Sequence, residues 1–377
     1  MSEEIPHFRP VWGEVDLGAL RDNTRALVEL AAPAAVLAVV KADAYGHGAV
    51  PAARAALEGG ARWLGVALVE EGLGLRAAGI DAPVLVLSEP PPAAADAVVG
   101  HDLTPVVYTS VGIDSLGAAV ARAGRGPLPV HLKVDTGMHR VGCAPGDAVA
   151  LAEKITSHAE LRFEGVCTHL AVADEPDHGY TASQLAAFEA VLAELGERGI
   201  RPPIVHAANS AGLLNQAASA RYDLVRLGIA LYGVPPAPDL AGRVALRPVL
   251  ALKACVSHVK ELAAGSRLSY GLRYELERPS VIATVPAGYA DGVPRNLGLV
   301  GGEVLVRGRR CPIAGTVTMD QLMVDAGAGP VEVGDEVVLL GRQGDEEITA
   351  TEWAARLGTI AYEIVSGIGP RVPRRYR

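Results

Sequence analysis

Lysine is scarce in this chain of 377 residues. Only five of its 34 basic residues are lysines, at positions 41, 133, 154, 253 and 260. Arginine does not lose its proton and does not form imines under ordinary conditions. A lysine in such a chain therefore indicates chemistry that arginine cannot perform, such as that of a nucleophilic amine.

Long apolar runs and dense positive charge are also missing. Stretches such as PAAVLAVV are too short to cross a bilayer. The N-terminus, MSEEIPHFRPVWGEVDL, lacks the basic end and apolar core of a signal peptide. The net charge is -9, and the one dense basic run is the short tail 371–377. We therefore expect a cytoplasmic protein that binds neither nucleic acid nor membranes.

Cysteine is rare and scattered. The four cysteines are at positions 143, 167, 255 and 311, and no CxxC, HExxH or EF-hand spacing occurs. The spacing favours reduced, structural cysteines and indicates neither a disulfide framework nor a metal site.

A regular alternation of short apolar stretches and helical segments fills residues 36–230. The candidate strands are AVLAVVK, RWLGVAL, PVLVLS, LTPVVY, PVHLKVD, LRFEGVCTHL, PIVHAA and DLVRLG. Eight strand–helix units in about 200 residues predict a (β/α)₈ α/β barrel, with a doubly wound open sheet as the alternative. The clearest helix is TASQLAAFEAVLAELGERG, which Thr181 or Ser183 could cap and Gly199 follows.

The sequence pattern changes after the Pro-rich stretch VPPAPDLAG (234–242), which is typical of a linker. Beyond it, short strand-like stretches are separated by Gly and Pro, and one helical segment, TATEWAARLG, interrupts them. We therefore expect a barrel over 12–240 and a mostly β C-terminal domain formed by 1–11 and 241–377. The strand-like WGEVDL is a candidate to pair with this second domain.

Polar residues gather at the predicted strand ends, where barrel chemistry collects. Five of the eight strands carry them: Lys41, Lys133 with Asp135, His169, Asn209 with Ser210, and Arg226. Each alone fits a solvated strand end, but five on one rim predict an active site.

The stretch AVVKADAYGHG ends a buried strand on Lys41, whose amine either reaches for water or acts as the reagent. After the last strand, in VRLGIALYG, the amides of Gly228 and Ile229 lie where barrels of this kind bind phosphate. Ser210 either caps a helix or points its hydroxyl to the same place. A lysine imine beside a phosphate site predicts pyridoxal 5'-phosphate.

Nine motifs in order resemble the signatures of the alanine racemase family: AVVKADAYGHG, LKVDTGMHRVG, THLAVAD, HAANSAG, VRLGIALYG, LSYG, PAGYADG, GTVTMDQ and TIAYEI. They extend from residue 12 to the tail. The resemblance implies a pyridoxal phosphate-dependent isomerase that interconverts L- and D-alanine by two bases and, by analogy, supplies D-alanine for peptidoglycan. It also implies a homodimer with shared active sites.

The same resemblance implies residue roles. Lys41 carries the cofactor as a Schiff base, and Arg226 faces the pyridine nitrogen. Because arginine cannot accept a proton, that nitrogen stays largely neutral, which limits leakage into transamination. The remaining cofactor contacts are Tyr45, Ser210, Gly228, Ile229 and Tyr362.

Two bases are implied on opposite faces of the substrate carbon: Lys41, and Tyr270 in LSYG. A phenol with the ordinary pKa of about 10 is a weak base at neutral pH, so we expect His169 and Arg226 to assist. The partner subunit is expected to supply Tyr270 and three of the substrate contacts. The substrate contacts are Arg140, Met319, Asp320 and Tyr289.

Lys133 has two interpretations. Family members often carry a carbamylated lysine here, which would pair with Arg140, and LKVDTGMHR keeps the seven-residue offset. The alternative is an unmodified amine paired with Asp135 or another rim acid. Thr318 departs from the cysteine that often precedes the Met-Asp pair, so thiol-directed inactivation is in doubt at that position.

Other functions remain open. The residues around Tyr362 and Met319 would determine whether the enzyme is a racemase of broader specificity. A decarboxylase would be expected to carry an acid in place of Arg226. A pyridoxal phosphate carrier would not need a second domain. His47 and His206 have plain interpretations, as a residue that shapes a turn and as a hydrogen-bonded rim residue.

Overall fold

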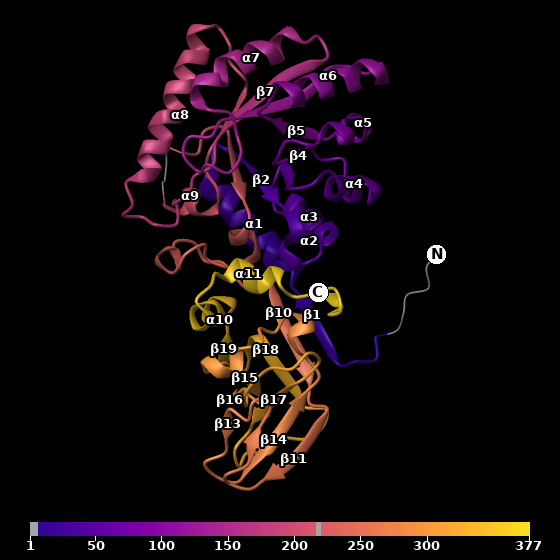
Figure 1. Ribbon diagram of the computed structural model, residues 1–377, viewed down its shortest axis with the longest axis vertical. Helices are drawn as coiled ribbons and strands as arrows, with labels where there is room; N and C mark the ends of the chain where they lie inside the picture. Colours follow the sequence, from indigo (N-terminus) through magenta and orange to yellow (C-terminus); the bar gives the residue numbers. More distant parts are fainter. Residues whose placement is uncertain (1–6, 216–219) are drawn as a thin grey trace. The chain divides into compact units, whose positions relative to one another are not determined.

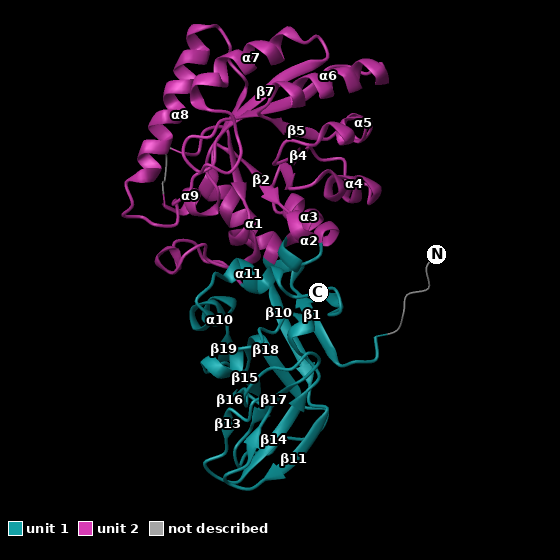
Figure 2. Ribbon diagram, in the orientation of Figure 1, with its two compact units in different colours: residues 1–19, 45–48, 248–377 teal, residues 20–44, 49–247 magenta. Residues whose placement is uncertain are grey.

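The computed structural model describes residues 7–215 and 220–377. The chain divides into two compact units, coloured separately in Figure 2. The unit that we call the barrel unit consists of residues 20–44 and 49–247. The unit that we call the β unit consists of residues 1–19, 45–48 and 248–377.

All eight predicted barrel segments form strands. They are β2 (Ala35–Val39), β3 (Trp63–Val66), β4 (Val84–Val86), β5 (Thr104–Val107), β6 (Leu128–Lys133), β7 (Leu161–Cys167), β8 (Ile204–His206) and β9 (Leu224–Leu227). Neighbours in the order β8-β7-β6-β5-β4-β3-β2-β9 pair in parallel. The barrel prediction is therefore confirmed, and the doubly wound alternative is wrong.

Two hydrogen bonds link the outer strands of that order. The Asp223 amide donates to the Val205 carbonyl at 3.0 Å, and the Arg226 amide donates to the Ala208 carbonyl at 2.9 Å. The sheet thus curls into a nearly closed barrel. Every residue of β4 and β5 is buried, as expected of parallel strands covered on both faces.

Helices surround the barrel strands in Figure 1. They are α1 (Leu17–Ala31), α2 (Lys41–Gly46), α3 (Ala49–Glu58), α4 (Val69–Ala77), α5 (Ala95–Gly100), α6 (Ser110–Ala123), α7 (Ala148–Ser157), α8 (Tyr180–Glu197) and α9 (Ser210–Asn215). The 3₁₀ turns of this unit are η1 (Pro92–Ala94), η2 (Pro145–Asp147), η3 (Ile229–Tyr232) and η4 (Pro238–Leu240).

The expected cap of α8 is wrong. Gly179 precedes the helix, and no side chain caps it. Thr181 and Ser183 lie inside the first turn, and Thr181 is buried. The helix begins earlier than expected because its apolar face starts packing at its first turn.

The β unit contains three sheets. The largest has the order β16-β15-β18-β10-β1-β20, with β19 paired to β18; a second has the order β11-β14-β17, and β12 pairs with β13. Their bounds are β1 (Val11–Val15), β10 (Leu250–Cys255), β11 (His258–Leu262), β12 (Arg267–Leu268), β13 (Tyr274–Glu275), β14 (Ser280–Val285), β15 (Glu303–Val306), β16 (Arg309–Pro312), β17 (Leu322–Asp325), β18 (Glu336–Gln343), β19 (Glu346–Ile348) and β20 (Arg374–Tyr376).

The N-terminal strand β1 belongs to the β unit. It pairs antiparallel with β10 and parallel with β20. These ladders explain why residues 12–19 group with the β unit, although we expected the barrel to begin at residue 12. The barrel unit ends at residue 247 rather than 240.

The β unit has more helix than the sequence indicates. The predicted helix is α10 (Ala350–Leu357), but a second, α11 (Ala361–Ser366), follows it, with the turns η5 (Tyr289–Asp291) and η6 (Leu297–Val300). A small core of Leu268, Leu276, Ile282 and Ala314 supports the β12–β13 hairpin. Over residues 7–215 and 220–377, no helix is both long and apolar enough to span a membrane.

Candidate active site

Lys41 lies two residues after the end of β2, at the carboxyl end of the barrel strands. The residues after it wind in the opposite hand to an ordinary helix: φ lies between 51° and 55° in Ala42, Asp43, Ala44 and Tyr45. Each L-residue in this conformation costs about 1–2 kcal/mol. Backbone strain of this kind gathers at functional sites, so the turn marks Lys41 as a candidate.

Acidic side chains hold the start of this left-handed turn. Glu71 in α4 accepts a hydrogen bond from the Ala42 amide at 2.6 Å, and its other oxygen accepts from the amides of Ala67 and Leu68. Asp43 accepts from the Ala49 amide at 2.7 Å. Side chains therefore satisfy amides on both sides of the turn.

The surroundings of the Lys41 amine favour its neutral form more than water does. Burial lowers its pKa, and the positive charge of Arg140 lowers it further, while Glu71 acts in the opposite direction. Among residues 7–215 and 220–377, the amine has no hydrogen-bond or ion-pair partner. A half-buried, partnerless lysine with a depressed pKa is suited to nucleophilic chemistry.

Arg226, on β9 next to β2, is buried with 6% of its surface exposed. Its Nη1 lies 2.7 Å from Nδ1 of His206. Its Nη2 donates to the carbonyls of Thr168 and Ala207 at 2.8 and 2.7 Å and lies 3.1 Å from Nδ1 of His169. The expected neighbourhood of His169 and Arg226 is therefore present.

His169 and His206 are neutral at physiological pH. Burial and the charge of Arg226 move the pKa of each well below the ordinary histidine value. Gln184 of α8 positions the first of them, because its amide donates to the His169 carbonyl at 3.0 Å and accepts from the Ala171 amide at 2.8 Å. His206 is fully buried, so it is an interior residue and not one of the rim.

Ser210 does not cap its helix, so that alternative is wrong. Asn209 takes this role by accepting from the Gly212 amide at 2.8 Å. The Ser210 hydroxyl oxygen instead accepts from the Gly228 amide at 3.0 Å and the Ala230 amide at 3.5 Å, which joins the ends of β8 and β9. Ser210, Gly228 and Ile229 thus meet at one point of the rim.

Lys133 is a buried cation without a counter-ion in the described part of the chain. Burial lowers its pKa, and the charges of Arg226 and Arg140 add to this effect. Asp135 is not its partner, because that carboxylate accepts from the amides of Gly137 and His139 at 3.0 Å. The carbamylated and the unmodified form of Lys133 both remain predictions.

Tyr270 lies at the tip of the β12–β13 hairpin of the β unit, with 71% of its surface exposed. Left-handed residues flank it, with φ of 64° at Ser269 and 79° at Gly271. The Thr316 hydroxyl donates to the Tyr270 carbonyl at 3.1 Å. The hairpin therefore presents a phenol outward from a fixed backbone.

Tyr289 and Met319 lie beside each other in the same unit. The Tyr289 amide donates to the Thr318 carbonyl at 2.9 Å, and the Ala290 amide donates to the Met319 carbonyl at 3.0 Å. Both side chains are exposed. The segment 316–319 thus connects Tyr270 with Tyr289 and Met319.

Ion pairs fix the neighbouring turn. Asp320 pairs with Arg371 at 2.7 Å, and the buried Asp291 pairs with Arg9 at 2.6 Å. Asp291 also accepts from the Gly288 amide at 3.0 Å, just before Tyr289. The Asp320 side chain is thus already engaged within the β unit.

Tyr45 and Tyr362 face each other within the β unit, with ring centroids 6.2 Å apart. Burial raises the pKa of Tyr45 to about 12. The phenol therefore stays protonated and is a hydrogen-bond donor.

Two buried residues were not identified as candidates from the sequence. His131 lies on β6 two residues before Lys133, and Glu164 lies on β7. Side chains two apart on a strand point to the same face, so the HLK spacing was a usable signal for His131. Nothing comparable pointed to Glu164.

The comparisons with known proteins define a two-domain barrel racemase. The family described as "Alanine racemase, N-terminal domain" matches residues 15–236, and "Alanine racemase, C-terminal domain" matches residues 249–376. An alanine racemase of Symbiobacterium thermophilum is 52% identical, covering 99% of this chain and 98% of its own. The chain belongs to the alanine racemase family.

Solved structures agree with this assignment. The alanine racemase of Streptomyces lavendulae is 43% identical with a TM-score of 0.92, covering 99% of this chain and 98% of its own. A histidine racemase of Leuconostoc mesenteroides is 30% identical with a TM-score of 0.90, covering 99% of each chain. This neighbour shares the fold and is named for a different amino acid.

Proposed function

We propose that this racemase interconverts L- and D-alanine with pyridoxal 5'-phosphate bound to Lys41. The observation that carries the proposal is the half-buried, partnerless amine of Lys41, with its lowered pKa, ahead of a left-handed turn at a barrel strand end. A neutral amine of this kind attacks an aldehyde, which a protonated one cannot do.

The residues on the rim fit this cofactor. The Ser210 hydroxyl and the amides that follow β9 are donors suited to a phosphate. Arg226 supplies N–H donors suited to an unprotonated ring nitrogen, and Tyr45 remains a donor because its pKa is about 12. When bound, the cofactor supplies an electron sink for the substrate carbon.

Two groups of this chain would move the proton. Lys41 would hold or deliver it on one face of the substrate carbon, and the phenol of Tyr270 would do so on the other. The exposure of Tyr270, Tyr289 and Met319 supports their use by a partner subunit in a homodimer. Arg140, which has no described partner, would bind the substrate carboxylate with the Met319 amide, and Asp320 would be a further substrate contact from the partner subunit.

Tyr289 and Tyr362 would narrow the entrance and would so restrict the substrate to a small side chain such as that of alanine. A cytoplasmic location and a role in supplying D-alanine for peptidoglycan remain predictions from the sequence.

A panel of single-enantiomer amino acids tests the proposal. We expect L- and D-alanine each to reach an equal mixture, measured by chiral chromatography, and serine to react more slowly. Histidine and other large residues should not react. Preferred turnover of histidine or another large amino acid, or decarboxylation in place of racemisation, would contradict it.

We also propose that Lys133 is carbamylated and pairs with Arg140. The support is a buried amine that lacks a counter-ion and lies in the field of Arg226 and Arg140. Reaction with carbon dioxide requires the neutral amine, and the product is an anion. Carbamylation would replace the electrostatic repulsion between Lys133 and Arg140 by attraction.

The pH dependence of carbamylation follows from the direction in which the pKa of Lys133 is shifted. Because the pKa of Lys133 is lowered, its neutral form is present at a lower pH than for an ordinary lysine, and carbamylation is lost as the pH falls through that lowered value. After incubation with carbon-13 bicarbonate at neutral pH, we expect a carbamate NMR signal. Lys133→Arg should abolish the signal and Lys260→Arg should retain it; an unchanged spectrum in Lys133→Arg would refute the assignment.

A further inference from the structure

A line of polar side chains runs through the barrel interior away from Arg226. Nε2 of His206 lies 2.8 Å from Nδ1 of His131. Nε2 of His131 faces Oε2 of Glu164 at 3.4 Å, which is within ion-pair distance but lacks hydrogen-bond geometry. The other oxygen of Glu164 accepts from Arg162 at 2.8 Å. Both imidazoles are fully buried, so no solvent interrupts the line.

The direction of the hydrogen bonds from Arg226 to His206 and from His206 to His131 is determined from one end. Arg226 only donates, so Nδ1 of His206 must accept and its proton lies on Nε2. That proton is donated to Nδ1 of His131, which must then carry its own proton on Nε2, facing Glu164. This line of side chains therefore requires two neutral imidazoles in the same tautomer and an acceptor at its end.

The sheet is built to supply that acceptor. The register between β6 and β7 shifts so that Val130 pairs with Phe163 but His131 pairs with Gly165, which leaves Glu164 as the extra residue. Such a bulge re-aims a side chain, and Glu164 is buried here. A Cβ on Gly165 would lie 2.5 Å from Nδ1 of His131, so glycine makes room for the ring.

The buried charge of Arg226 indicates a role for this line of side chains. No carboxylate of residues 7–215 or 220–377 lies within ion-pair distance of the buried Arg226. A buried charge without compensation is costly. The line connects Arg226 to a carboxylate that is itself held ionised, because His131 and Arg162 lower its pKa against the effect of burial.

We propose that Glu164 is the remote counter-charge and positioning residue of Arg226, acting through the neutral imidazoles of His131 and His206. It keeps the guanidinium charged and correctly oriented without a carboxylate at the site, where direct contact would occupy its donors. Only the last step, toward a bound ring nitrogen, rests on the proposed function.

The first test reads the tautomers in the protein as purified. In protein labelled with nitrogen-15 histidine, two-bond ring correlations should show His131 and His206 neutral and protonated at Nε2. Glu164→Leu removes the terminal acceptor, so both rings should change or broaden. Glu164→Gln keeps an oxygen acceptor without the charge, so the tautomers should remain.

The second test separates charge from structure. We expect Glu164→Gln to lower kcat/KM for alanine about tenfold by loss of the negative charge that faces His131, mainly through kcat. Asp114→Asn is the matched control, because Asp114 faces His158 at 3.2 Å outside the barrel, and it should leave kcat/KM unchanged.

A proton on Nδ1 of His206, unchanged rings in Glu164→Leu, or equal kinetics in Glu164→Gln and Asp114→Asn would each overturn the proposal. The wild-type spectrum decides the first point even if a variant does not fold. Failure of the wild-type protein to racemise alanine would instead refute the proposed function, with the tautomers still readable.

Discussion

Lys41→Ala is expected to yield a colourless protein that racemises alanine at least about 10⁴-fold more slowly, since one change removes both the attachment point and a base. Absorbance in the visible range and borohydride reduction report the attachment, and chiral chromatography reports the rate. The loss should be in kcat and should not be recovered with excess cofactor.

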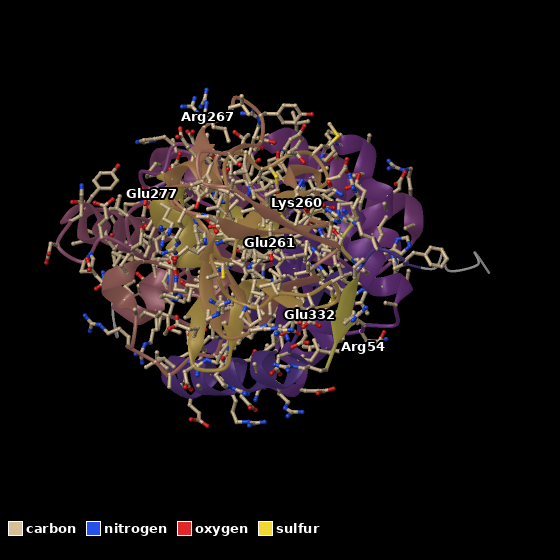
Figure 3. All side chains as sticks on the ribbon, turned by 90° about the horizontal axis from the view of Figure 1, so that it is seen from below. Arg54, Lys260, Glu261, Arg267, Glu277 and Glu332 are labelled. Carbon is tan, nitrogen blue, oxygen red and sulfur yellow. The ribbon has the colours of Figure 1, made fainter. Side chains whose placement is uncertain are left out.

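Lys260→Ala is the matched control. Lys260 is exposed on β11 and is labelled in Figure 3. It should bind the cofactor and turn over alanine like the wild type. Borohydride-reducible colour retained in Lys41→Ala would mean that another amine carries the cofactor.

Tyr270→Phe is expected to keep the cofactor and lose about 10²–10⁴-fold in kcat, the usual contribution of a positioned proton donor or acceptor. Tyr274→Phe is its control on the same hairpin. Tyr274 donates to Asp325 at 3.0 Å, so its loss should affect stability more than rate. Equal rates in the two variants would contradict a second base at position 270.

Mixing subunits distinguishes a shared site from a self-contained one. Random exchange between Lys41→Ala and Tyr270→Phe subunits makes half of the dimers mixed, and each mixed dimer has one site with both residues intact. Activity should therefore return to about a quarter of the wild-type value. No recovery, with exchange verified by mass spectrometry, would show that each subunit supplies its own phenol.

The strands and the rim could be predicted from the sequence because their signals are local. A buried parallel strand is a short apolar run, and a lysine or histidine at its end stands out. The same reasoning located Arg226, Ser210 and His169. The second domain was also predictable as β structure, since Gly and Pro punctuate its strands.

Other features depend on contacts that a single segment does not encode. Ala-Asp-Ala-Tyr carries no signal for a left-handed turn, and one hydrogen bond that holds the turn comes from Glu71, 29 residues after Ala42. Glu164 points inward because the pairing register between β6 and β7 shifts by one residue. Asn209 and Ser210 compete for one cap, and only the position of the Gly228 amide decides the outcome.

The left-handed turn after Lys41 has a consequence for how this backbone tolerates mirror-image building blocks. Its φ angles of 51° to 55° are those that a D-residue adopts without strain. A semisynthetic chain with D-alanine at position 42 or 44 would therefore retain the turn at lower conformational cost. The stereochemical preference of this one segment is thus opposite to that of the helices around it.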